Sequence, residues 1–182
     1  MNYCSHCGAP VHYAIPDGDN RERHICTACD TIHYLNPKIV AGCIPVWEDK
    51  LLLCRRAIEP RHGLWTLPAG FMEQGETLSD AARRETREEA NAEVELDELH
   101  TVITLPHVSH VQMLFRARLT APVFSPGVET LETQLFREEE IPWDELAFET
   151  MRRTLRHFFA DRRRGLFQLH VEDIPQAPPK GG

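Results

Sequence analysis

Two pairs of cysteines in the first 30 residues have the spacing of metal ligands: Cys4 with Cys7, and Cys26 with Cys29. Each Cys-x-x-Cys pair places two thiolates on one tight turn, and two such turns complete a tetrahedral sulfur site that zinc accepts without strain. The 18 residues between the pairs fall in the range of zinc ribbons. A redox dithiol is the competing interpretation, but the βαβ pattern that surrounds such motifs is absent. We therefore predict a structural Zn²⁺ site.

The segment around these cysteines has too few large apolar residues to bury a core of its own. A bound ion would supply the folding free energy that a core supplies elsewhere. The nearby histidines at positions 6, 24 and 33 are expected at the surface, since four cysteines already fill the coordination shell. The remaining Cys43 and Cys54 are expected to be small buried side chains.

A second set of chemically active residues lies in residues 77–90, which we expect to form a helix. An apolar stripe begins at Leu78, passes through two alanines and meets Glu85, Glu88 and Glu89. Carboxylates on an inward face are costly unless a cation neutralises them. Three of them at i, i+3 and i+4 can converge on a hard divalent ion, Mg²⁺ or Mn²⁺. The alternative is a solvated acidic face with ion pairs to neighbouring arginines.

The flanking residues favour the metal. The chain reads Gly70-x5-Glu76-x7-Arg84-Glu85-Thr86-x-Glu88-Glu89. This pattern resembles the Nudix box, G-x5-E-x7-R-E-U-x-E-E-x-G-U, where U is aliphatic. Thr86 departs from it at an aliphatic position, and Asn91 stands in the place of the last glycine. Asparagine tolerates the left-handed conformation that ends a helix, and Thr77 with Asp80 resembles a capping box at its start.

The resemblance implies a set of roles for the site. Divalent ions would be held by Glu85, Glu88, Glu89, Glu76 and the carbonyl of Gly70. Arg84 would orient one of these glutamates rather than touch the substrate. A box glutamate would activate the attacking water, with Glu132 on a late strand as the alternative. For the substrate we expect contacts from Arg55, Trp65, Gly70 and Phe71. Because Arg55 and Arg56 alternate on a strand, at most one of them faces the pocket, and we favour Arg55.

A zinc ribbon ahead of a Nudix domain narrows the resemblance to two branches. The NADH pyrophosphatase branch carries a Ser-Gln-Pro-Trp-Pro-Phe-Pro segment, which residues 105–111 do not match. The other branch is similar to the plant plastid FAD/ADP-ribose pyrophosphatase, and residues 15–18, 36–38, 63–70, 125–127 and 146–148 carry that likeness. We therefore expect hydrolysis of ADP-ribose or FAD to a nucleoside monophosphate and a phosphorylated product. A sensor that binds a nucleotide sugar without cleaving it would have lost box carboxylates, and all are present here.

The elements that position these residues follow from hydrophobic patterning. We expect strands over residues 39–46, 51–57, 93–105, 111–120 and 132–138, with a turn over residues 48–50, and helices over residues 77–90 and 149–164. The expected fold class is α/β (α+β), a Nudix α/β/α sandwich with a mixed sheet behind a small zinc-ribbon module. The expected domains are residues 1–36, the zinc ribbon, residues 37–174, the Nudix hydrolase domain, and residues 175–182, a flexible tail.

Composition limits the partners. The 182 residues include 28 Asp and Glu against 20 Lys and Arg, a net charge of −8, which argues against a nucleic-acid partner. Arg21 and Arg23 are too few for a basic stripe, so an RNA-targeting ribbon is the less favoured alternative. No apolar run approaches a membrane span and no signal peptide precedes Cys4, so we expect a cytoplasmic protein without membrane contact. The expected partner is a small nucleotide substrate, and a homodimer is one expected assembly.

Overall fold

The computed structural model describes residues 1–175 and divides the chain into two compact units, Met1–Pro37 and Lys38–Gly182. Each unit is described by itself. Apart from its first residue, the predicted tail of residues 175–182 lies outside the described part of the chain.

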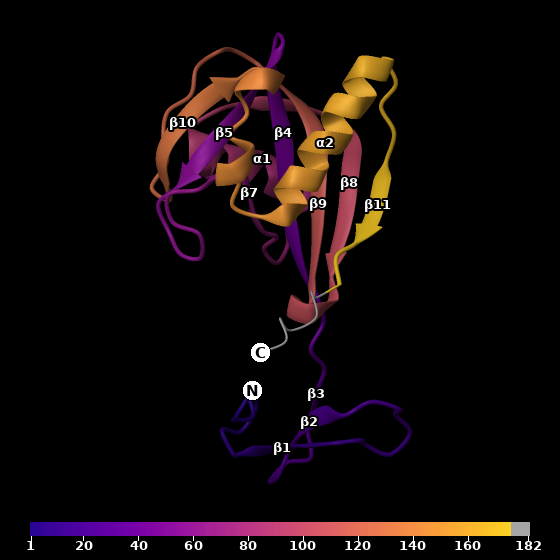
Figure 1. The fold of residues 1–182 in the computed structure, drawn as a ribbon. Coiled ribbons are helices and arrows are strands. Elements are labelled where there is room, and N and C mark those ends of the chain that lie inside the picture. The colour runs from indigo at the N-terminus through magenta and orange to yellow at the C-terminus, as the bar shows by residue number, and fades with distance from the viewer. Residues whose placement is uncertain (176–182) are drawn as a thin grey trace, which may run out of the picture. The chain divides into compact units, whose positions relative to one another are not determined.

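The small unit is a three-stranded antiparallel sheet (Figure 1). Its strands are β1 (Val11–Ala14), β2 (Arg23–Cys26) and β3 (Ile32–His33), in the order β1-β2-β3. Its fully buried residues are Cys4, Pro16 and Cys26. Two of these three are members of the predicted metal-binding set, so the cysteines occupy the place of a hydrophobic core.

The large unit is built on an eight-stranded mixed sheet, ordered β10-β5-β4-β9-β8-β11, with β6 on β5 and β7 on β4. The strands are β4 (Lys38–Trp47), β5 (Lys50–Arg56), β6 (Trp65–Thr66), β7 (Ala69–Phe71), β8 (Val94–Leu105), β9 (His110–Leu119), β10 (Thr130–Phe136) and β11 (His170–Asp173). The pairs β4–β9 and β8–β11 are parallel and the others antiparallel. The predicted turn between β4 and β5 is confirmed: Trp47 pairs with Lys50, and Glu48 adopts the positive φ that tight hairpins require.

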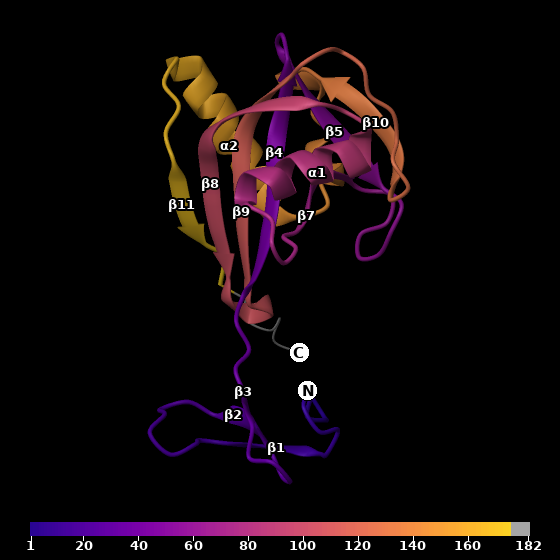
Figure 2. The same ribbon diagram turned by 180° about the vertical axis from the view of Figure 1, so that it is seen from behind.

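Two helices cover opposite faces of this sheet: α2 (Glu149–Arg164) lies over one face in Figure 1, and α1 (Leu78–Ala90) over the other in Figure 2. The predicted start of α1 is confirmed, because the Thr77 hydroxyl accepts a hydrogen bond from the amide of Asp80. Its predicted end is confirmed as well, with Asn91 in the left-handed conformation. Short 3₁₀ turns lie at Pro106–Val108, Glu138–Glu140 and Trp143–Glu145. No helix among the described residues is long and apolar enough to cross a membrane.

The alternation of side chains along β5 divides the core into two layers. Leu51 and Leu53 pack in the cluster that includes the buried face of α2, whereas Leu52 and Cys54 pack with the end of α1. A fully buried leucine contributes roughly 1.5–3 kcal/mol by leaving water, so both layers strongly hold the register of β5. Every residue that follows on this strand is thereby assigned to one face of the sheet.

Candidate active site

The helix α1 directs its glutamates into a cavity of about 1150 Å³ in the large unit. Glu85, Glu88 and Glu89 all line this cavity, as does Gly70 on β7. The cavity is also lined by apolar and basic side chains, including Arg56, Phe71, Phe148, His107, His110 and Ile174. A cavity of this size exceeds what a single small ligand needs and suits a ligand with two separate groups.

Electrostatic strain concentrates at Glu89. The side chain is 9% exposed, and its Oε2 has no hydrogen-bond partner among the described residues. Burial, reinforced by the charge of Glu85, raises the pKa of Glu89 to about 8, although an amide hydrogen bond from Ala69 opposes the shift. Burial also raises the pKa of Glu85, against the effect of its bond from Arg84. Such crowded carboxylates are stable as anions only beside a cation.

This donor set fits a hard divalent ion. Mg²⁺ and Mn²⁺ take carboxylate and carbonyl oxygens, and the cavity is lined by three glutamates of one helix, with one Glu89 oxygen unpartnered among the described residues. Glu85, Glu88, Glu89 and the carbonyl of Gly70 are the residues that could hold such ions. A side chain on Gly70 would prevent this, because a Cβ there would lie 2.4 Å from the Glu85 Oε1 atom.

Arg84 organises the carboxylates from the cavity wall. Its guanidinium donates to both oxygens of Glu76, at 3.0 and 2.7 Å, to Glu85 at 2.6 Å and to Glu88 at 3.0 Å. It also donates to the carbonyl of Phe71 at 3.1 Å. The arginine lowers the pKa of Glu76, which does not line the cavity. Glu76 therefore acts here by holding Arg84, and Arg84 by orienting the two glutamates.

Four carboxylates that were not predicted line the cavity: Glu59, Glu73, Glu129 and Glu149. Glu129 lines the cavity, and its charge adds to the raised pKa of both Glu85 and Glu89. The loop before it is fastened to α1: the Asn91 amide donates to the carbonyls at positions 125 and 126, at 3.2 and 3.1 Å. Gly127 approaches so closely that a Cβ would lie 1.7 Å from the Glu88 carbonyl oxygen. The sequence signal for this loop was Gly127, because only a residue without a side chain permits so close a contact with α1.

Three predicted site residues lie in one row on the opposite face of the sheet. Arg55 pairs in register with Trp65 on β6 and with Glu132 on β10. Trp65 is 6% exposed and packs edge-on against Phe136 in the α2-side cluster, while Glu132 faces Arg55 at 3.5 Å. None of the three lines the cavity. Arg56, whose side chain points to the other face of β5, lines the cavity instead.

The basic and aromatic wall supplies groups for the organic part of a ligand. The Cζ atom of Arg56 lies 5.2 Å from the centroid of the Phe148 ring. Phe71 is 47% exposed and meets His110 edge to face at 5.1 Å, with the Lys38 ammonium 5.0 Å from its ring. Cations held beside aromatic faces can bind phosphate oxygens while the rings contact a nucleobase or sugar.

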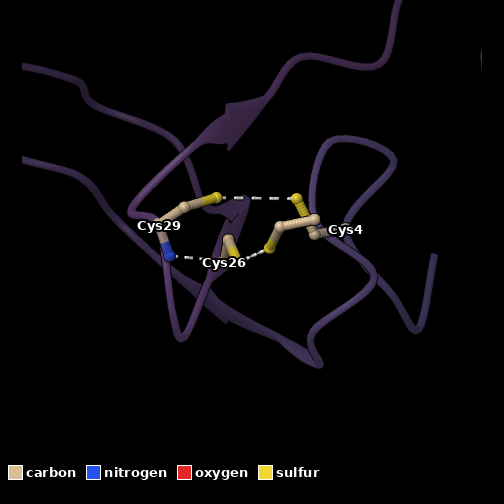
Figure 3. A group of neighbouring side chains, drawn as sticks. Cys4, Cys26 and Cys29 are labelled. Carbon is tan, nitrogen blue, oxygen red and sulfur yellow. Dashed lines mark hydrogen bonds between the residues drawn. The ribbon is translucent and has the colours of Figure 1, made fainter.

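The four cysteines of the small unit converge as predicted. Their sulfur atoms lie within 4.8 Å of one another, with Cys4 to Cys29 at 3.8 Å and Cys7 to Cys26 at 3.4 Å. Figure 3 shows side chains from the two cysteine turns pointing toward one another. Tetrahedral zinc with bonds of about 2.3 Å needs sulfurs roughly 3.8 Å apart, so the set fits that ion. His33 is only half-buried, but its Nε2 lies 3.3 Å from the Cys4 sulfur, where it supports a ligand.

Comparisons with known proteins agree with this geometry. Residues 2–35 match the family model described as Nudix N-terminal, a zinc ribbon, and residues 36–161 match the NUDIX domain model. The chain therefore belongs to the Nudix hydrolase family, with an N-terminal zinc-ribbon module ahead of the NUDIX domain.

Individual relatives refine this picture. A NUDIX hydrolase from Nitrosomonas europaea is 53% identical, with a TM-score of 0.94 over 97% of this chain and 100% of its own. The protein named NAD-capped RNA hydrolase NudC from Salmonella heidelberg is 31% identical over 77% of this chain, and the one from Photobacterium profundum 31% over 78%. The chain spans about half the length of these curated relatives. An ADP-ribose pyrophosphatase from Streptococcus suis, 22% identical with a TM-score of 0.59, shares the fold. The curated relatives thus carry the NudC name rather than that of the expected FAD/ADP-ribose branch.

Proposed function

We propose that this protein is a Mg²⁺- or Mn²⁺-dependent hydrolase of a nucleoside diphosphate linked to a second group, with ADP-ribose or FAD as the favoured substrates. The observation that carries the proposal is the unpartnered, buried oxygen of Glu89 beside Glu85 and Glu88 in a cavity that is also lined by basic and aromatic side chains. The products are a nucleoside monophosphate and the phosphorylated second group.

The chain's own residues divide the work. Glu85, Glu88 and Glu89 would hold the divalent ions, which when bound neutralise the pyrophosphate oxygens. Arg84 keeps two of these glutamates oriented through direct hydrogen bonds. Arg56 contacts a phosphate oxygen, and Phe71 packs against the base or sugar. This placement holds the reacting phosphorus near the carboxylates.

The group that accepts the proton of the attacking water belongs among the cavity glutamates. Glu132, the alternative from the sequence, faces Arg55 across the sheet and does not line the cavity. Glu129 lines it without taking part in the Arg84 network, so its oxygens are free to meet water. We place Glu129 beside Glu88 and Glu89 as the candidate bases.

A second candidate is hydrolysis of NAD(H), free or at the end of RNA. Relatives 31% identical over more than three quarters of this chain carry that activity in their name. Against it stand the absence of the Ser-Gln-Pro-Trp-Pro-Phe-Pro segment from residues 105–111 and the small number of basic residues in the ribbon. For the ribbon itself we propose a structural role, and for the protein a cytoplasmic location.

One substrate panel tests these proposals. Purified protein is incubated with ADP-ribose, FAD, NADH and an NAD-capped RNA, each with Mg²⁺ or Mn²⁺, and released phosphomonoester is measured. We expect the highest kcat/KM on ADP-ribose or FAD and none without a divalent ion. A higher kcat/KM on NADH or capped RNA would favour the second candidate. No turnover of any of them would contradict both.

A further inference from the structure

A second cluster of metal-binding side chains lies in the large unit, away from the catalytic cavity. His100, Asp161 and His170 each offer a ligand atom, and these atoms lie within 4.8 Å of one another. His170 Nε2 lies 2.8 Å from the Asp161 Oδ2 atom. None of the three lines the cavity that holds the box glutamates. The Nudix reaction therefore does not account for this cluster.

The three side chains come from three elements that lie side by side at one edge of the sheet: β8, α2 and the last strand, β11 (Figure 1). The pairing of β8 with β9 shifts register between Leu99 and Thr101, which leaves His100 as an extra residue. Because a bulge re-aims a side chain, His100 and Thr101 can both face α2, where Thr101 bonds Thr154 at 3.1 Å. Bulges of this kind are retained next to functional sites.

His100 has no hydrogen-bond partner for either ring nitrogen among the described residues, although it is only 1% exposed. Its neighbours are ring edges: Phe158 and Phe167 with centroids 6.0 Å away, and His170 at 5.2 Å. A buried polar group without a partner destabilises the fold, so an imidazole held in this state calls for a ligand. Its position directs that ligand to the space it shares with Asp161 and His170.

We propose that His100, Asp161 and His170 form a second transition-metal site that binds Zn²⁺ in a structural role. Two imidazoles and one carboxylate suit a borderline-soft divalent ion, whereas Mg²⁺ prefers oxygen ligands alone. The supporting contacts have the form found around metal ligands. The backbone N–H of Gln168 donates to Asp161 at 3.1 Å, and the ring of His157 stacks on that of His170 at 4.0 Å.

The function of this ion is to fasten β11 to the body of the unit. β11 is a four-residue strand at the edge of the sheet, bonded to β8 alone. Val171 is exposed and Glu172 is half-buried, so the burial of apolar surface contributes little to holding β11 in place. An ion shared by β8, α2 and β11 replaces that burial with coordinate bonds, much as the cysteine site replaces a core in the small unit.

The test is a metal count on the full chain, loaded with Zn²⁺ and freed of loose ions. We expect about two equivalents per chain, one in each site. His170→Gln and, as a nearly isosteric change, Asp161→Asn should each lower the count to about one. Cys26→Ser should remove the other equivalent. His62→Gln, at an exposed histidine outside both clusters, is the matched control and should keep about two.

Cobalt substitution tells the sites apart. In Asp161→Asn the thiolate-to-cobalt charge-transfer band of the cysteine site should persist, while the bands of the nitrogen–oxygen site should disappear. One equivalent in the wild-type chain, unaffected by Asp161→Asn, would overturn the proposal whether or not His170→Gln folds. A crystal with anomalous zinc signal at the cysteines and ordinary water density beside His100 would overturn it as well.

Discussion

The two units of this chain use metal-binding residues in opposite ways. In the small unit the buried residues are two cysteines and one proline, and no hydrophobic cluster forms among them. In the large unit two hydrophobic clusters lie on either side of the sheet, and the glutamates of α1 project from that scaffold into a cavity. Metal is thus expected to fold the first unit, whereas the second unit folds on its hydrophobic clusters and is expected to use metal at the cavity and at the edge strand β11. A hydrophobic core can thus stabilise a unit in place of a metal ion, but it cannot neutralise phosphate oxygens as a metal ion does.

The largest effect that would test this contrast is expected from Cys26→Ser. Structural zinc contributes on the order of 10–16 kcal/mol to a small module, so loss of one ligand should unfold residues 1–37 and release its zinc. The large unit should keep its melting temperature, because its clusters contain no residue of the small unit. Hydrogen exchange resolved by residue, together with zinc analysis, measures both outcomes. A protected small unit without its zinc would contradict the comparison.

The next largest effect is expected in the cavity. Glu88→Gln should lower kcat by at least about a hundredfold, since it removes one charge from the metal-binding set, and should leave the fold unchanged. Glu88 is exposed at 58% of its side chain and belongs to no core, so its amide isostere costs little stability. Glu95→Gln, an exposed glutamate on β8 outside the cavity, is the control and should keep full activity. Near-normal turnover of Glu88→Gln at saturating Mg²⁺ would remove Glu88 from the site.

A smaller effect on kcat/KM is expected to distinguish the glutamate that lines the cavity, Glu129, from Glu132 on the other face of the sheet. Glu129→Gln should reduce kcat/KM about tenfold, the lower end of what loss of a supporting carboxylate costs at a metal site. Glu132→Gln should change it less than about twofold, because Glu132 pairs with Arg55 on the other face. Steady-state kinetics on one substrate compares the two matched substitutions directly. The reverse ranking would restore Glu132 as the catalytic alternative.

The smallest effect concerns pH and the buried charge of Glu89. Its pKa rises from 4.5 in the unfolded chain to about 8 in the folded one, so between these values unfolding releases a proton. Stability of the large unit without Mg²⁺ should therefore fall as pH rises from about 5 to about 8, with melting lower by a few °C. Glu89→Gln should flatten this slope, and Mg²⁺ should restore the wild-type melting temperature at pH 8. Equal slopes for both proteins would show that Glu89 is ionised without metal.

The local features of the fold were predictable from the sequence. The capping residues and the helical period correctly located α1 between Thr77 and Asn91. The polar residues between two apolar runs correctly located the hairpin turn at Glu48. The cysteine spacing predicted the convergence of four sulfurs. These features depend on residues close in sequence, for which helix geometry and turn chemistry fix the relative positions.

Features that depend on strand pairing were not predictable. Successive side chains of β5 point to opposite faces of the sheet, and the packing of Leu52 and Cys54 against α1 determines which of them face the cavity. Arg55, with its neighbours Trp65 and Glu132, therefore faces the α2 side. The short β11 has no periodic pattern of its own, and it forms because β8 offers an edge. Substrate preference was likewise not determined, since the curated relatives carry the name of a different branch.

The sequence by itself determined the ligands: four cysteines in two turns, and a run of glutamates on one side of a single helix. Each cysteine turn and the glutamate run are local in sequence, whereas the two turns meet through the pairing of β1 with β2. The tertiary structure decided which distant residues join them, bringing Glu129 and Arg56 to the cavity and His100, Asp161 and His170 to one edge of the sheet. The positions of Arg56 and His100 rest on the register of β5 and on the bulge in β8, because a shift of one residue in a strand turns its side chains to the other face.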